Sequence, residues 1–327
     1  MRYSILVPST SKEFLAHENS PWSNFFAEMS RQGFNHVSLD QRPDLVIFNN
    51  VSWKNILRVL SPKIEKKVLI IWESAITSPL NHKIRFRKHF NLILIPTEYW
   101  RLTKDEIAFV WPQASEDPVS KRQKVRKDRI VLIARNKISL AKGENYSLRR
   151  KIIFKSSLPL DVYGYDWNRS RRESFSLMIK SILIQLCSCS RINIKGARYA
   201  FLKAQKSVSI AEDKIDRLSD YKYSLVIENS SDYVSEKIVD ALIAGCIPIY
   251  IGPPLQEFGF PPTIALACEP NLEAILDSFA LLQSDELKCQ RILDAGSTFM
   301  RSKKFKQQFS NSRVLKGLAS TIIGKLK

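Results

Sequence analysis

The segment from Tyr221 to Pro254 constrains the fold of this 327-residue chain more than any other part of it. Residues 223–227 are apolar and rich in β-formers, which is typical of a buried parallel strand. A run of turn-forming residues follows, then a helical pattern that ends at a glycine. A second apolar strand, 247–251, closes with a Gly-Pro-Pro turn. The segment therefore predicts a strand–helix–strand unit of a parallel sheet.

Polar residues gather in the loop between that strand and that helix. Five of them lie within ten positions: Glu228, Asn229, Tyr233, Glu236 and Lys237. A helix N-terminus beyond the carboxyl end of a parallel strand is a ready site for anions. Lys237 opposes the helix dipole, which suggests that it serves a negative ligand. We expect Ser235 to cap the helix and Gly245 to end it. The alternative is an ordinary strand–helix–strand unit with a solvated loop.

The same stretch resembles the signature of the α-1,3/1,4-fucosyltransferases, glycosyltransferase family 10. The family pattern runs Tyr-Lys-Phe-x-Leu-x-x-Glu-Asn-Ser, then Tyr-Val-Thr-Glu-Lys, then an apolar helix and x-x-Pro-Ile/Val-x-x-Gly. This chain carries the counterparts in order, with Ser235 in place of the threonine: Tyr221-Lys222-Tyr223, Glu228-Asn229-Ser230, Tyr233 to Lys237, and Ile247-Pro248-Ile249 to Gly252. The resemblance implies a GT-B fold, with two Rossmann-like domains facing each other across a cleft, GDP-fucose as donor, and inversion at the sugar carbon.

The resemblance also implies a donor site. Arg149 corresponds to an arginine that binds the diphosphate, and Arg150 is the neighbouring alternative; a guanidinium donates in a fork and stays charged. Glu236 would accept hydrogen bonds from donor hydroxyls, and Lys237 would help Arg149 neutralise the leaving diphosphate. The remaining expected donor-binding residues are Glu228, Asn229 and Tyr233. Lys214 corresponds to a family lysine, or is a solvated helix residue.

Glu73 is the expected general base. It follows a predicted strand, 67–72, and resembles the acidic residue of the family's Glu-Ser-Pro motif, although Ala75 stands where that motif has proline. A carboxylate there would face the cleft and take the acceptor proton. The alternatives are a strand-end glutamate that contacts solvent or caps a turn, and Glu18 as a substitute base.

Strand-like and helical stretches alternate along the chain, which implies an α/β protein with parallel sheets. We expect an N-terminal Rossmann-like acceptor domain over 1–120, a C-terminal Rossmann-like donor domain over 121–300, and a basic amphipathic tail over 301–327. The polar stretch 112–128 is the expected linker.

The net charge of +19 is concentrated in two places. Residues 121–210 hold 22 basic and 5 acidic residues, and residues 301–327 hold 8 basic residues and no acidic one. No zinc-finger, RNA-recognition or helix-turn-helix pattern accompanies this charge, so we expect no nucleic-acid partner. A basic nucleic-acid or membrane-binding module is the remote alternative to an enzyme. The enzyme alternative is a retaining GT-B glycosyltransferase that uses the Glu-x7-Glu spacing of Glu228 and Glu236 with another nucleotide sugar.

Two basic segments leave alternatives open. The tail places Val314, Leu315, Leu318, Ile322 and Leu326 on one helical face, which would lie on an anionic membrane or pack against the protein. The insert 168–210 contains an apolar stretch that would serve as an acceptor loop, a membrane contact or plain packing. Cys187 and Cys189 lack further metal-binding partners nearby, so we expect buried apolar cysteines.

The expected activity is transfer of L-fucose from GDP-fucose to a glycan hydroxyl, α-1,3/1,4 to GlcNAc or Glc, in lipopolysaccharide or other glycan synthesis. No Asp-x-Asp motif occurs, so no cofactor is expected, with a divalent metal at most stimulatory. Animal members of the family carry an N-terminal membrane anchor, whereas the N-terminus here has too short an apolar core. Five cysteines without framework spacing fit a reducing compartment. We therefore expect a bacterial-type cytoplasmic enzyme, and leave open whether it is peripheral on the inner face of the membrane.

Overall fold

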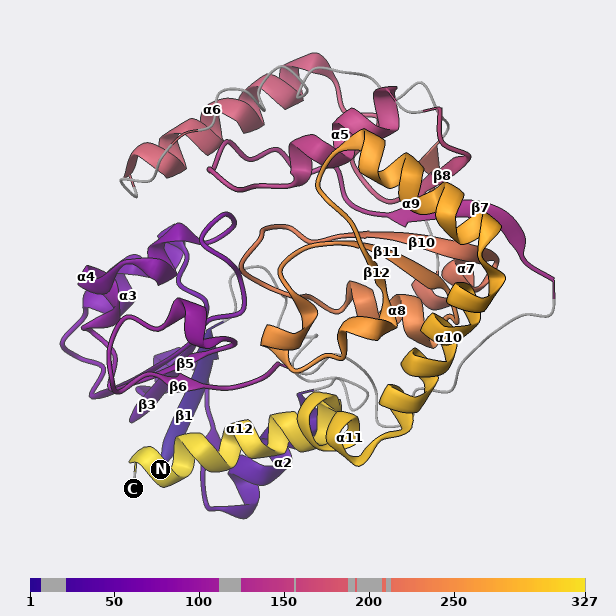
Figure 1. Ribbon diagram of the computed structural model, residues 1–327. Coiled ribbons are helices and arrows are strands. Elements are labelled where there is room, and N and C mark those ends of the chain that lie inside the picture. Colours follow the sequence, from indigo (N-terminus) through magenta and orange to yellow (C-terminus); the bar gives the residue numbers. More distant parts are fainter. Residues whose placement is uncertain are drawn as a thin grey trace. The chain divides into compact units, whose positions relative to one another are not determined.

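The computed structural model describes residues 1–6, 22–111, 125–155, 157–187, 192, 208–209 and 213–326. The chain forms two compact units, each built on a parallel sheet with helices packed against it (Figure 1). Unit 1 comprises Met1–Glu116 and Lys303–Lys327, and unit 2 comprises Asp117–Ser302. The C-terminal segment that was expected to form a separate tail is thus part of unit 1. Most of the expected linker lies outside the described residues.

The sheet of unit 1 has the strand order β2-β1-β3-β4-β5-β6, and every pair is parallel. Its strands are β1 (Arg2–Leu6), β2 (Asn35–His36), β3 (Leu45–Asn49), β4 (Lys66–Ile70), β5 (Leu92–Ile95) and β6 (Ile107–Ala108). Strands β3, β4 and β5 are buried at nearly every position, as expected for parallel strands covered on both faces. The helices are α2 (Ser23–Arg31), α3 (Ile56–Leu60), α4 (Ile84–Arg87), α11 (Lys303–Phe309) and α12 (Asn311–Leu326), with 3-10 turns η1 (Leu39–Gln41), η2 (Trp53–Asn55), η3 (Pro79–His82) and η4 (Glu98–Trp100).

Helix α12 answers one question that the sequence left open. All five residues of its predicted apolar face are buried, and the helix packs against α2 within unit 1. The Ser320 hydroxyl of α12 also donates a hydrogen bond to Glu28 of α2, at 3.4 Å. The tail is therefore a packed helix, and its apolar face is not available to a membrane.

Unit 2 has the strand order β12-β11-β10-β7-β8-β9, again with all pairs parallel. Its strands are β7 (Lys127–Ile133), β8 (Leu160–Tyr163), β9 (Val208–Ser209), β10 (Tyr221–Ile227), β11 (Ile247–Ile251) and β12 (Leu266–Ala267). Numbered within the unit, the order is the 3-2-1-4-5-6 arrangement of dinucleotide-binding folds. From β7 the chain adds strands toward one edge of the sheet, and from β10 it adds them toward the other edge, so the switch point lies between β7 and β10. Ligands of such folds bind beyond the carboxyl ends of the strands at this point.

The helices of unit 2 are α5 (Tyr146–Lys155), α6 (Arg171–Cys187), α7 (Lys214–Ser219), α8 (Lys237–Ile243), α9 (Leu272–Ser284) and α10 (Glu286–Arg301), with 3-10 turns η6 (Leu255–Phe258) and η7 (Pro262–Ile264). Alternate residues of β10 and β11 point into one core with α5, α9 and α10. Helix α8 contacts β10 and β11. Because both faces of β10 and β11 are covered, these strands read as continuous apolar runs in the sequence.

Helix α8 ends at the predicted glycine, but its N-cap residue is not the predicted one. Gly245 has a φ of +70°. Its N–H donates to Leu242 at 2.9 Å, and the next N–H donates to Ala241 at 2.8 Å, which together form a Schellman motif. The prediction that Ser235 caps the helix is wrong, because the N-cap residue is Glu236 and its side chain makes no capping bond.

Two further findings concern the insert and membrane spans. Cys187 is exposed, so the prediction that it is buried is wrong, while Cys189 lies outside the described residues. Among the described helices, none combines the length and apolar character needed to cross a bilayer.

Candidate functional site

Glu228 follows the carboxyl end of β10 and is fully buried. Its carboxylate accepts hydrogen bonds from the Ser235 N–H at 3.0 Å and the Ser235 hydroxyl at 2.7 Å. It also accepts one from the Lys237 ammonium at 3.0 Å. Buried charges persist in proteins when they are paired and hydrogen-bonded in this way. Glu228 therefore holds the β10–α8 loop in place, which explains why serine stands at position 235.

Lys237 has an internal partner in this structure. Its ammonium bonds Glu228 and also the Ser235 hydroxyl, the latter at 2.6 Å. The side chain is 17% exposed, so the group lies near the surface and is largely shielded from solvent. Its predicted role at a diphosphate would require it to share its three donors between Glu228 and the ligand.

Glu236 is a carboxylate of this loop whose side chain is 54% exposed. Lys214 of α7 lies 3.3 Å from it and also bonds Asp240 in the first turn of α8. Desolvation acts to raise the pKa of Glu236, but the charges of Lys237 and Lys214 outweigh it and lower the pKa to about 2. Glu236 is thus an anion throughout the neutral range. Lys214 is an ion-paired link between α7 and α8 rather than a fully solvated helix residue.

Arg149 lies at the switch point between β7 and β10. It belongs to the first turn of α5, and its Nη2 donates to the Ile227 carbonyl at the end of β10 and to the Asn229 side chain at 2.9 Å. The guanidinium also lies over the Tyr146 ring, 5.2 Å from its centre. Burial lowers the pKa of Arg149, while neighbouring charges that include Glu228 raise it.

Arg150 points elsewhere. It donates to the Lys137 carbonyl and to the Ser147 hydroxyl, at 3.2 Å for the latter. Burial lowers the pKa of Arg150 to about 10, against the attraction of Glu144. Of the two arginines that the sequence left as candidates, Arg149 is therefore the one beside Asn229.

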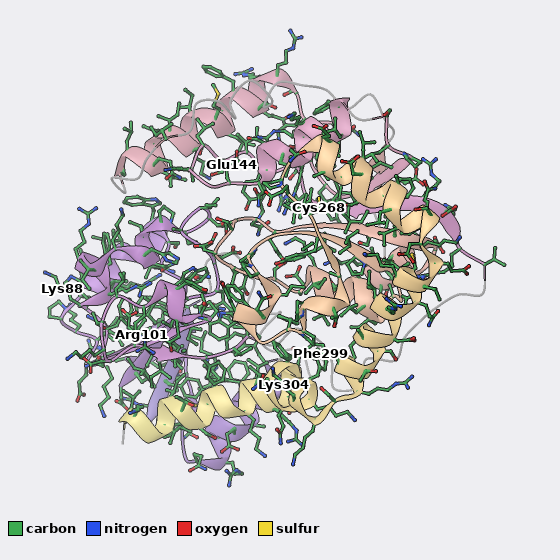
Figure 2. All side chains as sticks on the ribbon, in the orientation of Figure 1. Lys88, Arg101, Glu144, Cys268, Phe299 and Lys304 are labelled. Carbon is green, nitrogen blue, oxygen red and sulfur yellow. The ribbon has the colours of Figure 1, made fainter. Side chains whose placement is uncertain are left out.

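Two loops meet at this edge of the sheet. The Asn145 N–H, just before α5, donates to the Asn229 carbonyl at 3.1 Å, and Glu144 forms an antiparallel bridge with Ser230. Figure 2 shows Glu144 beside the start of α5. Its carboxylate accepts from the Ser147 N–H at 2.8 Å, so it caps that helix. The loop after β7 and the loop after β10 are thereby joined.

Three buried polar groups near this edge have no hydrogen-bond partner among the described residues: Arg149 Nε, the Ser230 hydroxyl and the Tyr250 hydroxyl. Burial and the charge of Glu228 raise the pKa of Tyr250. A Cβ built on Gly252 would come within 2.3 Å of that hydroxyl and 2.8 Å of Glu228 Cγ. Only glycine therefore fits at position 252. Buried polar groups without partners are uncommon, and a bound ligand or water is an ordinary explanation.

The turn after β8 lies against the end of β7. The Trp167 indole donates to the Ala134 carbonyl at 2.8 Å. A Cβ built on Gly164, whose φ is +141°, would lie 2.1 Å from the same carbonyl oxygen. This close approach accounts for the glycine at position 164.

Glu73 lies in unit 1, just beyond the carboxyl end of β4. Two asparagines hold its backbone. The side-chain oxygen of Asn50, a residue with a φ of +59°, accepts hydrogen bonds from the Trp72 N–H at 2.9 Å and the Glu73 N–H at 3.4 Å. The side-chain amide of Asn81 donates to the same oxygen at 3.3 Å. Asn81 is fully buried and accepts from the Val51 N–H at 2.7 Å. The sequence pattern gave no sign of this support, because the asparagines lie 23 and 8 positions from Glu73.

The neighbours of Glu73 are also fixed. His82 Nε2 donates to the Glu73 carbonyl at 2.9 Å. The Trp72 ring stacks on Trp111, with centroids 4.0 Å apart and an interplanar angle of 11°. The turn that carries Glu73 is therefore held by the His82 hydrogen bond and by the stacking of Trp72 on Trp111.

The predicted site residues divide between the two units. Unit 2 brings together Arg149, Glu228, Asn229, Glu236 and Lys237, with half-buried Tyr233 in the same loop. Glu73 belongs to unit 1, and Glu18 lies outside the described residues. Within the described parts of the chain, no group of three or more His, Cys, Asp or Glu residues is placed to hold a metal ion.

No protein-family profile matches the chain. One curated relative, a fucosyltransferase-like protein of Arabidopsis thaliana, is 47% identical over 49 residues, which are 14% of this chain and 10% of that protein. The chain thus matches about a tenth of the length of this relative.

Solved structures match over nearly the whole chain. A crystal structure of α1,3-fucosyltransferase aligns with a TM-score of 0.56 and 15% identity, over 99% of this chain and 90% of that one. HepE of Anabaena, in complex with UDP and glucose, aligns with a TM-score of 0.59 and 11% identity, over 99% of this chain and 100% of that one. Identities this low establish the fold alone, and the short curated match adds the sequence likeness. The chain has the GT-B fold of these glycosyltransferases and, as its motifs predicted, resembles the fucosyltransferases.

Proposed function

We propose that this chain is a glycosyltransferase that moves L-fucose from GDP-fucose to a hydroxyl of a glycan, with inversion at the sugar carbon. One observation carries the proposal: the buried polar groups without partners, Arg149 Nε, the Ser230 hydroxyl and the Tyr250 hydroxyl, lie at the carboxyl edge of β10 and β11. That edge is where nucleotides bind in this strand order. The fucosyltransferase-type motif occupies the same loop.

Arg149 is the proposed diphosphate ligand. Two contacts of its Nη2 fix the guanidinium, which leaves the Nε N–H to find an acceptor. A phosphate oxygen would satisfy it with a charge-assisted hydrogen bond. Asn229 and Tyr233 would shape the nucleotide and sugar pocket, and Glu236 would accept from donor hydroxyls. Glu228 supports the loop from within rather than by touching the donor.

The reaction is a single displacement. The acceptor oxygen forms a bond to the anomeric carbon of fucose while the bond from that carbon to the diphosphate oxygen breaks, and GDP departs. Glu73 takes the proton of the acceptor hydroxyl. Arg149 and Lys237 stabilise the charge that develops on the diphosphate. These fixed cations can act where other transferases use a metal.

A retaining transferase with another nucleotide sugar is the alternative. It rests on the spacing between Glu228 and Glu236 and would use both carboxylates. Glu228 is fully buried and accepts three hydrogen bonds within the protein, which speaks against it. The acceptor, a role for lipopolysaccharide and the cytoplasmic location stay predictions.

The first experiment is a screen of nucleotide sugars for transfer to lactose and N-acetyllactosamine, with product NMR to assign the anomeric configuration. We expect activity with GDP-fucose, a thermal shift with GDP larger than with UDP, and an α-linked product. Activity confined to a UDP-sugar would favour the retaining alternative. Salt-dependent binding to nucleic-acid duplexes without any shift from GDP would favour a binding module.

Variants then test the site. Glu236→Gln keeps the size of a half-exposed side chain and should lose transfer while staying folded, with a loss of stability under about 1 kcal/mol at neutral pH. Glu269→Gln, at an exposed carboxylate of the same unit, is the matched control and should keep full activity. Arg149→Lys keeps a charge but loses the forked donors, so its KM for the donor should rise. Full activity in both single variants, Glu236→Gln and Arg149→Lys, would rule out this site.

A further inference from the structure

Helix α6 buries polar residues and exposes apolar ones, which is the reverse of the usual arrangement of a surface helix. The residues that it buries are Ser174, Ser181 and Gln185. The Ser181 hydroxyl accepts a hydrogen bond from the Leu140 N–H at 2.9 Å, so the polar side is bonded into unit 2. Figure 1 shows α6 at the outer rim of this unit.

The opposite side of α6 exposes four large apolar side chains. Phe175 is 53% exposed, Ile179 39%, Leu183 56% and Leu186 59%. Their spacing of four, four and three residues places them in one stripe along the helix. Single exposed apolar residues are ordinary on a protein surface, but an aligned row on one helix face marks an interaction surface. We call these four residues the α6 stripe.

The charges around the α6 stripe indicate the kind of partner. Helix α6 itself carries three basic residues and one acidic residue, Glu173. Arg171 and Arg172 are exposed in the first turn of α6, and Lys180 is exposed at its middle. An apolar helix face flanked by cations is the pattern that places a helix in the interface of an anionic lipid bilayer.

We propose that the α6 stripe docks unit 2 on an anionic phospholipid surface, with the four apolar side chains entering the acyl boundary and the flanking cations contacting headgroup phosphates. A second copy of the chain is a poorer occupant, because pairing this face with itself would bring like charges together. This role differs from the one considered for the tail, whose apolar face is buried. It does not depend on the identity of the donor sugar, since membrane binding is measured without transfer.

The test is sedimentation of the full chain with vesicles of phosphatidylcholine, with and without phosphatidylglycerol. We expect binding to the anionic vesicles that weakens as salt rises. The double variant Phe175→Ser/Leu183→Ser should bind at least about tenfold more weakly, since burial of one such side chain is worth about a factor of ten. Lys180→Glu should weaken binding to anionic vesicles and leave the weak binding to neutral vesicles unchanged.

The control variant removes the same chemistry elsewhere in unit 2. Leu281 and Leu287 are 40% and 71% exposed, so Leu281→Ser/Leu287→Ser should bind as the unaltered chain does. All variants replace exposed side chains, and equal thermal midpoints confirm that they fold. Absence of binding to anionic vesicles, or equal binding by the stripe and control variants, would overturn the proposal. So would a dimer in light scattering that the stripe variant abolishes while vesicle binding persists.

Discussion

Replacement of Glu228 by alanine should cost unit 2 a large part of its stability. The change removes one buried carboxylate and leaves three donors without their acceptor: the N–H and hydroxyl of Ser235 and the ammonium of Lys237. Breaking a buried ion pair costs about 3–5 kcal/mol. Since the Lys237 side chain is 17% exposed and can turn partly toward water, we expect a loss near the lower limit, about 3 kcal/mol. That corresponds to a fall of about 6–12 °C in the unfolding midpoint for a domain of this size.

Urea unfolding followed by circular dichroism measures the loss, and a double-mutant cycle identifies its cause. Lys237→Met alone also strands a buried charge, whereas Glu228→Ala/Lys237→Met removes both charges. The double variant should therefore be less destabilised than the sum of the two single variants. Glu236→Ala is the control and should lose under about 1 kcal/mol, because its side chain is half exposed. A Glu228→Ala variant within about 0.5 kcal/mol of the parent, or strictly additive effects, would refute this account.

Three further outcomes follow from the same structure. Asn81→Ala should lower kcat more than it raises the donor KM, because it loosens the turn that carries Glu73; equal changes in both would argue against a positioning role. Gly164→Ala should destabilise unit 2 by about 2–4 kcal/mol in urea unfolding, since a Cβ there meets the Ala134 carbonyl. Glu236 has a pKa lowered from 4.5 to about 2, so its contribution to stability is present above pH 4.5 and is lost as pH falls toward 2. The stability difference between the parent and Glu236→Gln should accordingly shrink on acidification across that window, and a difference that grows would contradict the sign.

The regular elements could be predicted because their sequence patterns are local. Strand β11 spans 247–251 as predicted, and β4 and β10 differ from the expected 67–72 and 223–227 by at most two residues at an end. Strands β2, β9 and β12, with two residues each, were not predicted. Gly245 was placed correctly for the same local reason, since a left-handed C′ residue follows from the sequence around it.

Side-chain partners could not be predicted in the same way. Lys237 was expected to serve a negative ligand, yet it bonds Glu228, because the loop folds back on the end of β10. Ser235 was expected to cap α8 and instead donates to the same carboxylate. Both outcomes depend on where the loop crosses the strand end in space. Spacing along the chain does not contain that information.

The sequence by itself determined the strand–loop–helix motif, its likeness to the fucosyltransferases and the α/β class, since these follow from residue order and periodicity. Only the tertiary structure decided which carboxylate of the loop is buried and which is exposed, that two asparagines hold the turn of Glu73, and that α12 hides its apolar face while α6 shows one. The physical reason is the same in each case. Burial and hydrogen-bond partnership are set by residues distant in sequence that the fold brings together. An apolar helix face is therefore part of the core in α12 and the proposed docking surface in α6.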